Sequence, residues 1–110
     1  MVYAVQGHFG FRNTARRDAV MNNVQTRLAS EVKWGVTTTQ AITTMAGDPG
    51  MVVEVRFTTD AARDLFWNDV IAFMSTGING PTTGSYIQQH DCPHDGVNPE
   101  PCVISERQDY

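Results

Sequence analysis

The chain alternates between two hydrophobic periodicities, and the order in which they occur restricts its fold more than any other feature. In residues 2–11 the large apolar side chains share one parity and most polar ones the other, which is typical of a strand with one buried face. Residues 14–31 and 60–76 instead repeat apolar side chains at helical spacing after residues that can cap a helix. The predicted strands are 2–11, 32–45, 51–57 and 85–92, and the predicted helices are 14–31 and 60–76.

The two middle strands are predicted to form a hairpin. Residues 32–45 are rich in threonine and other β-branched residues, which favour a pleated strand over a helix. Residues 47–50, Gly-Asp-Pro-Gly, place four turn-forming residues in succession before the alternating segment 51–57. A hairpin brings these two strands side by side in antiparallel orientation.

The strand, helix, strand, strand, helix, strand order predicts an α+β fold of the ferredoxin-like β-α-β-β-α-β kind. This fold has a four-stranded antiparallel sheet with two helices on one face, and its first and third strands are central. Leu65 belongs to the predicted apolar stripe of the second helix, and Arg17 is expected to face water on the first. The helices are predicted to reach the core through Val20, Val24, Leu28, Phe66, Val70 and Phe73.

The chain is predicted to divide into a ferredoxin-like α+β domain, residues 1–92, and a C-terminal extension or arm, residues 93–110. A length of 110 residues allows one core and leaves no room for a second domain of similar size. Within the extension only residues 102–105 are expected to form a short strand. The extension holds few large apolar residues, so we expect it to become ordered only with a cross-link or a partner.

The composition argues against a nucleic acid or a membrane as the partner. Eight Lys plus Arg face twelve Asp plus Glu, and the net charge of −4 repels a phosphate backbone on average. The chain lacks an apolar run of the roughly 18 residues that a membrane span needs. Residues 1–6 lack the basic start of a signal peptide, so we expect the protein to be cytoplasmic on synthesis.

The sheet face without helices is predicted to be polar, and two of its residues are histidines. By parity this face carries His8, Glu54 and His90. If His8 and His90 are cross-strand neighbours flanked by Glu54, the group can hold a metal or shuttle a proton. The alternative is a solvated face with two ordinary histidines, because parity determines the face and not the register.

A second candidate site lies at the end of the last predicted strand. His90, Cys92 and His94 are spaced two residues apart, and Cys102 follows. These four side chains are potential zinc ligands, although their spacing matches no standard zinc finger or knuckle. Cys92 and Cys102 can equally form a disulfide or stay as two free thiols. The serines lack a nucleophile elbow, so no catalytic residue and no other cofactor is predicted.

The β-α-β-β-α-β order over residues 2–92, with Asp64-Leu65-Phe66-Trp67 in the second helix, resembles the dimeric α+β barrel superfamily. That superfamily includes monooxygenases of antibiotic biosynthesis and haem-degrading relatives, and its members build the substrate cavity between the open sheet faces of two protomers. The resemblance implies a small dimeric enzyme of monooxygenase type as an alternative. The helix-free face predicted here is polar, whereas such cavities are usually lined by apolar side chains.

The chain is also similar to small proteins encoded among the structural genes of tailed bacteriophages that infect actinobacteria. The likeness rests on the runs of threonine and alanine, the stretch Thr76-Gly77-Ile78-Asn79-Gly80-Pro81 and the segment His90-Asp91-Cys92-Pro93-His94-Asp95. It implies a non-enzymatic virion protein, capsid-associated or at a head-to-tail or tail junction. Its expected partners are other copies of itself, as a homo-oligomer, or other virion proteins.

Overall fold

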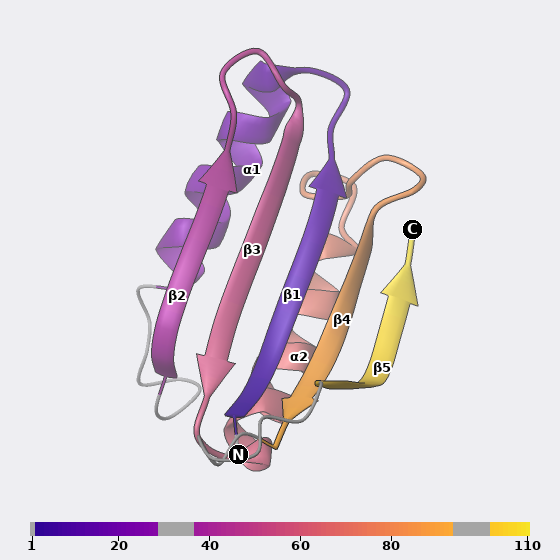
Figure 1. The fold of residues 1–110 in the computed structure, drawn as a ribbon. Coiled ribbons are helices and arrows are strands. Elements are labelled where there is room, and N and C mark those ends of the chain that lie inside the picture. Colours follow the sequence, from indigo (N-terminus) through magenta and orange to yellow (C-terminus); the bar gives the residue numbers. More distant parts are fainter. Residues whose placement is uncertain (1, 29–36, 94–101) are drawn as a thin grey trace.

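The computed structural model describes residues 2–28, 37–93 and 102–110, which form an α+β structure with two helices and a five-stranded antiparallel sheet (Figure 1). The elements in chain order are β1 (Val2–Gly10), α1 (Thr14–Leu28), β2 (Thr37–Thr44), β3 (Gly50–Phe57), α2 (Asp60–Met74), β4 (Tyr86–Cys92) and β5 (Val103–Asp109).

The strands lie in the order β2-β3-β1-β4-β5, so β1 occupies the middle of the sheet. Both helices lie behind the same face of the sheet, as the sequence predicted (Figure 1). The predicted number of four strands is wrong, because β5 pairs with β4 and adds a fifth. Every residue of β5 is exposed, so this strand carries no buried apolar parity by which sequence reasoning could recognise its full length.

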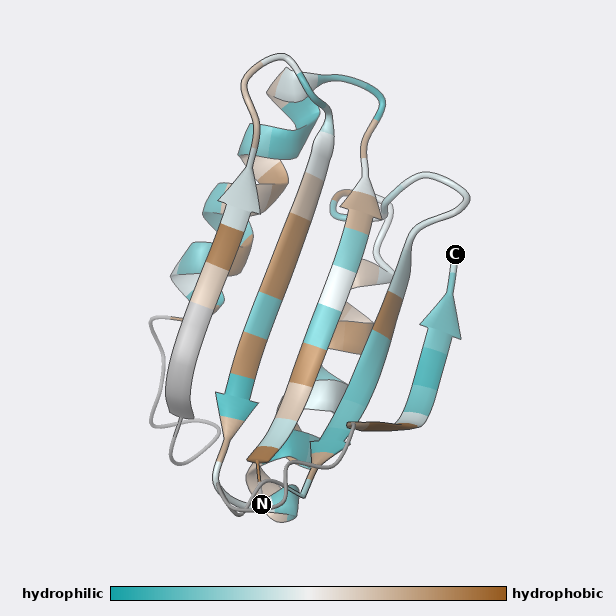
Figure 2. Ribbon diagram, viewed as in Figure 1, coloured by the Kyte–Doolittle hydropathy of each residue, from teal (hydrophilic) through white to brown (hydrophobic). Residues whose placement is uncertain are grey.

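The hydrophobic core is built from buried residues of the sheet and of both helices. Figure 2 shows hydrophobic segments, in brown, along the ribbons of the strands and the helices. Val55, Phe57 and Met74 are fully buried there, and the rings of Phe57 and Phe66 lie 5.4 Å apart. The predicted core residues of the helices all belong to this core or pack against it. Leu65 is the exception on the predicted stripe of α2, because it is 58% exposed. The buried face of α2 runs instead through Ala62, Phe66, Val70 and Met74.

Arg17 is buried, which corrects the expectation that this side of α1 faces water. Its guanidinium donates a hydrogen bond to the backbone carbonyl of Met45 at 2.7 Å and another to that of Asp48. Its Nη2 also pairs with Asp18 at 2.8 Å. Arg17 therefore ties α1 to the turn of the β2–β3 hairpin, a role that helical periodicity alone does not reveal.

Two more arginines connect the layers of the fold. Arg27 of α1 forms a two-point ion pair with Asp69 of α2, with both N···O distances at 2.6 Å. Buried Arg63 of α2 pairs with Asp91 of β4, and its guanidinium lies over the ring of Tyr3 at 5.2 Å. These contacts hold the helices to each other and to one face of the sheet. Neither α1 nor α2 covers the opposite face (Figure 1).

None of the helices in the described ranges is long and apolar enough to cross a bilayer.

Candidate functional site on the helix-free sheet face

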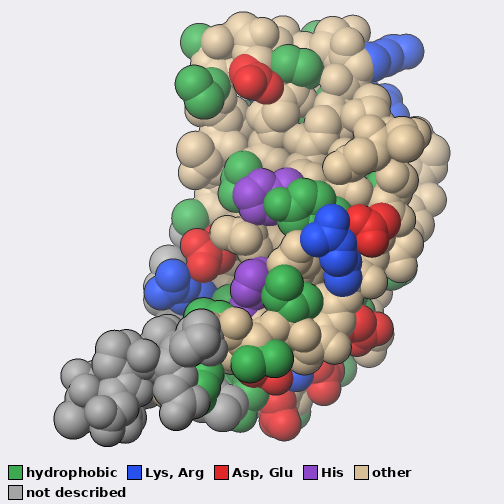
Figure 3. All heavy atoms as spheres, turned by 45° about the vertical axis from the view of Figure 1, so that its right-hand side comes forward, with side chains coloured by type: hydrophobic (Ala, Val, Ile, Leu, Met, Phe, Trp, Pro, Cys, Tyr) green, Lys and Arg blue, Asp and Glu red, His purple; other side chains and the backbone are tan. Residues whose placement is uncertain are grey.

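The helix-free face is the side of the sheet that carries Ala4, Gln6 and His8 of β1. The register determines their neighbours. Ala4 lies between Arg56 and His90, Gln6 between Glu54 and Gln88, and His8 between Val52 and Tyr86. Figure 3 shows that histidine, hydrophobic and charged side chains are interspersed over this side of the molecule.

A stack of side chains crosses β1, β4 and β5 on this face. The rings of His8 and Tyr86 lie 4.8 Å apart and within 19° of parallel. The guanidinium carbon of Arg107 lies 4.2 Å from the centroid of the same tyrosine ring. Arg107 also pairs with Asp109 at 2.9 Å. The stack ties the exposed β5 to the middle of the sheet through aromatic and cation–π contacts.

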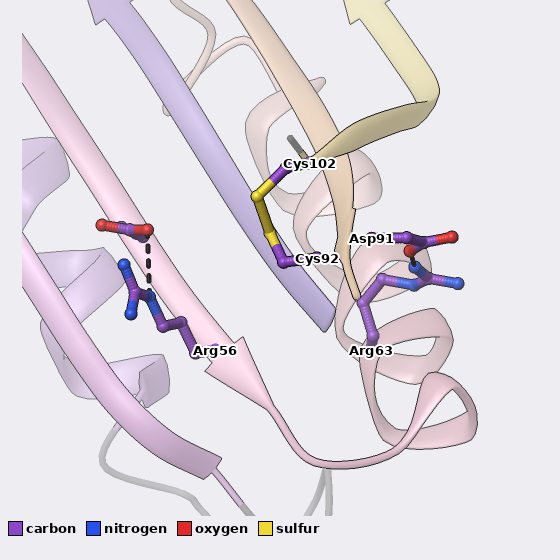
Figure 4. Close-up of a disulfide and its surroundings, with 6 residues drawn as sticks. Arg56, Arg63, Asp91, Cys92 and Cys102 are labelled. Carbon is purple, nitrogen blue, oxygen red and sulfur yellow. Dashed lines mark hydrogen bonds and ion pairs between the residues drawn. A yellow bond between two sulfur atoms is a disulfide. The ribbon is translucent and has the colours of Figure 1, made fainter. Parts of the chain in front are cut away.

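The lower part of the face holds an ion pair on β3 and a disulfide between β4 and β5 (Figure 4). Arg56 Nε donates to Glu54 Oε1 at 3.2 Å. Cys92 and Cys102 are bonded, with their Cα atoms 4.2 Å apart. The ion pair lies on one side of β1 and the disulfide on the other (Figure 4).

His90 lies in the same part of the face. The side chain of His90 is partly exposed, but its Nε2 atom is buried and has no hydrogen-bond partner in the described part of the chain. A cavity of about 130 Å³ opens beside it, lined by Glu54, Arg56, Gln6, Ala4 and the disulfide. Polar groups from three strands therefore meet in one hollow.

The predicted grouping of His8, His90 and Glu54 is only partly brought together. His8 pairs with Tyr86, whereas His90 pairs with Ala4, four residues away along β1, so the two histidines are not cross-strand neighbours. Glu54 and His90 do line the same cavity. Parity placed all three residues on the correct face, but it could not supply the register that separates His8 from the other two.

The two cysteines among the four potential zinc ligands are joined to each other. A disulfide sulfur is not the thiolate that zinc binds, so Cys92 and Cys102 are not available as thiolate ligands in this state. His94 lies outside the described residues. Within the described ranges no group of three or more His, Cys, Asp or Glu side chains is placed to hold a metal ion.

Sequence reasoning missed the residues that attach β5. Arg107 and Asp109 lie two residues apart in a strand without apolar alternation. This spacing, which places two side chains on the same face of a strand, was the signal in the sequence that could have indicated their pairing. Tyr110 follows the strand, donates its backbone N–H to Ser85 at 2.9 Å and accepts from the backbone N–H of Gly84 at 3.0 Å. Its ring meets Phe9 edge-on at 6.2 Å. Burial raises the pKa of Tyr110, whose hydroxyl oxygen is buried without a hydrogen-bond partner in the described part of the chain.

Comparisons of the chain with known protein families, curated proteins and solved structures gave no match.

Proposed function

We propose that this chain is a non-enzymatic structural protein that acts through protein–protein contacts within a tailed-phage particle. It would be associated with the capsid or placed at a head-to-tail or tail junction, next to other copies of itself or to other virion proteins. The observation that carries the proposal is β5, in which all seven residues from Val103 to Asp109 are exposed.

An exposed edge strand is a surface to which another chain can add. Val103 and Ile104 at the start of β5 are 61% and 52% exposed. In the described part of the chain β5 pairs with β4 alone, so its other edge offers backbone donors and acceptors. A strand of a neighbouring subunit that pairs with this edge satisfies those backbone groups and lies beside both apolar side chains, which point to opposite faces of the sheet.

The helix-free face supports contact with proteins more than enclosure of an apolar substrate. It displays the ion pairs Glu54–Arg56 and Arg107–Asp109, each with partly exposed side chains. Mixed charges of this kind suit the polar rim of a protein–protein interface. A monooxygenase-type cavity between two such faces would have to bury these charges, which is costly. We therefore favour the structural role over the dimeric enzyme.

We also propose that β1 to β4 and the two helices form a ferredoxin-like unit to which β5 is added. Two observations support this assignment. β1 lies between β3 and β4 in the sheet, and β2 is the outer neighbour of β3. Both helices lie behind the same face of the sheet (Figure 1).

The virion assignment can be tested on purified particles of the phage that encodes the chain. We expect quantitative mass spectrometry to find the chain in density-gradient-purified particles at a constant ratio to the major capsid protein. An abundant protein of infected cells that is absent from the particle serves as the control for contamination. Finding this chain in the cells and not in the particles would contradict the assignment.

A further inference from the structure

We propose that a hollow between the start of α1 and the loop after α2 binds a phosphate group that carries two negative charges. The hollow, here called the Arg12–Arg16 hollow, has a volume of about 400 Å³. Arg12 and Arg16 line it at the start of α1, and the loop contributes Gly77, Gly80, Pro81 and Thr82. This inference stands apart from the virion proposal, because it concerns neither β5 nor the helix-free face.

Arg12 and Arg16 differ from the other arginines of the chain in their charge partners. In the described part of the chain neither of the two pairs with a carboxylate. The other arginines each pair with an Asp or Glu side chain, namely Arg17, Arg27, Arg56, Arg63 and Arg107. The described residues that line the hollow include no Asp or Glu. Two uncompensated positive charges therefore meet at one hollow of a chain whose net charge is −4.

The start of α1 adds to this positive charge. Asn13 caps the helix, and its Oδ1 accepts a hydrogen bond from the backbone N–H of Arg16 at 2.8 Å. The first turn of α1 contains no acidic residue. Because a helix N-terminus carries a partial positive charge, acidic side chains are favourable there and arginines are not. An anion bound at Arg12 and Arg16 relieves this unfavourable accumulation of positive charge.

A ligand in the hollow can reach both side chains. Arg12 is exposed and Arg16 is partly exposed. Arg16 Nη2 donates to the backbone carbonyl of Gly77 at 2.8 Å, which positions the guanidinium against the loop and leaves its other N–H donors for a ligand. Thr82 also lines the hollow, and its hydroxyl can donate to an oxygen of the same ligand.

The charge and the size of the hollow favour a phosphate monoester. Two guanidinium groups bind a dianion more strongly than a monoanion, and their forked donors match the oxygens of phosphate. A phosphodiester carries a single charge, so the backbone of a nucleic acid is the poorer ligand. A volume of about 400 Å³ corresponds to roughly thirteen waters. The hollow therefore has room for the phosphate and for the organic group attached to it.

The test is an NMR titration of the full-length, oxidised protein with methyl phosphate, and with dimethyl phosphate at matched ionic strength. At pH about 7.5 the monoester carries close to two charges, and the diester carries one. Methyl phosphate should shift the amide signals of Gly80 and Thr82 saturably, with a dissociation constant of about 1 mM or weaker. Dimethyl phosphate should bind at least about tenfold more weakly. No saturable shift with methyl phosphate, or equal affinity for the diester, would overturn the proposal.

Variants make the test specific to the hollow. Arg12→Gln and Arg16→Gln each remove one positive charge and should each weaken the binding of methyl phosphate at least about tenfold. Arg12 precedes the first residue of α1, so Arg12→Gln leaves the helix itself unchanged. Arg107→Gln is the matched control, because it removes the same charge from an arginine that pairs with Asp109, and it should leave the affinity unchanged. An equal loss of affinity in Arg107→Gln and Arg12→Gln would contradict the site.

Two capped peptides identify the source of the phosphate group. If capped Gly-phosphoserine-Gly binds at least as tightly as methyl phosphate, the hollow accepts a phosphorylated side chain of another polypeptide. If methyl phosphate binds and the phosphopeptide does not, the ligand is a small phosphate monoester. Equal binding of capped Gly-Ser-Gly and of the phosphopeptide would show recognition of backbone groups and would overturn the assignment to a phosphate.

Discussion

The guanidinium carbon of Arg107 lies 4.2 Å from the centre of the Tyr86 ring, so a side chain of β5 covers an aromatic ring of β4. Such an exposed cation–π contact typically contributes about 0.5 to 1 kcal/mol. The side chains of β5 are otherwise exposed, and the strand is attached to the sheet by its ladder with β4, the disulfide and Tyr110. β5 is therefore held by backbone pairing and a cross-link, because none of its own side chains is buried.

The Cys92–Cys102 bond should control the order of β5. The bond joins two residues ten positions apart, and closing a loop of this length contributes about 2 to 4 kcal/mol in the chain-entropy description. In the free, reduced protein we expect the amides of Val103 and Ile104 to exchange rapidly with solvent, while those of β1 and β3 stay protected. Hydrogen exchange before and after reduction by a dithiol measures this. Strong protection of Val103 and Ile104 after reduction would show that β5 belongs to the domain without the cross-link.

Phe66 should be a main contributor to the stability of the core. It is 3% exposed and packs against Phe57, and truncation of a buried phenylalanine typically costs about 3 to 5 kcal/mol. Its neighbour Leu65 is 58% exposed and provides the matched control. In urea unfolding we expect Phe66→Ala to lose that amount and Leu65→Ala to change stability by less than about 0.5 kcal/mol. Equal losses in the two variants would contradict the packing.

Arg17 should stabilise the attachment of the β2–β3 hairpin to α1. Its hydrogen bonds reach the backbone carbonyls of Met45 and Asp48, and hydrogen bonds to a charged group typically contribute about 1.5 to 3 kcal/mol. We expect Arg17→Met to lower the free energy of unfolding by that amount. Exposed Arg12 is the control, and Arg12→Met should have an effect within about 0.5 kcal/mol. An unchanged free energy of unfolding in Arg17→Met would show that water can replace Arg17 as the hydrogen-bond donor to the two carbonyls.

Tyr110 should make the protein sensitive to alkaline pH. Burial raises the pKa of its hydroxyl above the ordinary value of about 10, so the folded state keeps this proton at a pH where the unfolded state releases it. The stability from Tyr110 is fully present below pH about 10 and falls as the pH rises through the folded pKa. Urea unfolding between pH 8 and 11 should show a smaller alkaline loss in Tyr110→Phe. An identical loss in the two proteins would contradict the burial of this hydroxyl.

The strands and helices that bury one face could be predicted from the sequence, because burial leaves a repeating pattern of apolar residues. A strand without a buried face leaves no such pattern. The alternation in β1 and β3 and the apolar repeat of α1 and α2 located these elements because burial acts on every second residue of a strand and on one stripe of a helix. Leu65 and Arg17 escaped this reasoning, since a helical stripe is broad and an arginine can be buried by backbone carbonyls. Only the start of β5 was expected, as a short strand over residues 102–105, because neither face of β5 is buried.

For the candidate site, the sequence predicted which face of the sheet the residues occupy but not which of them are neighbours. Parity placed His8, Glu54 and His90 on the helix-free face, but the register, which parity does not determine, separates His8 from His90. The spacing of Cys92 and Cys102 allowed a metal, a disulfide or free thiols, and geometry was needed to choose the disulfide. The hollow beside Ala4 depends on which residues face this small residue across two strands, so the sequence alone could not show it.

The most direct test of the central claim is the mass of the oxidised full chain in solution, measured by sedimentation equilibrium. We expect a mass of at least twice the 12.2 kDa of one chain. Combining Val103→Ser with Ile104→Ser should raise the dissociation constant of the oligomer at least tenfold. Leu65→Ser, an exposed apolar change on α2, should leave the mass unchanged. A chain that stays monomeric at high micromolar concentration, or that dissociates equally in the Leu65→Ser control, would contradict the claim that β5 is an interface between copies.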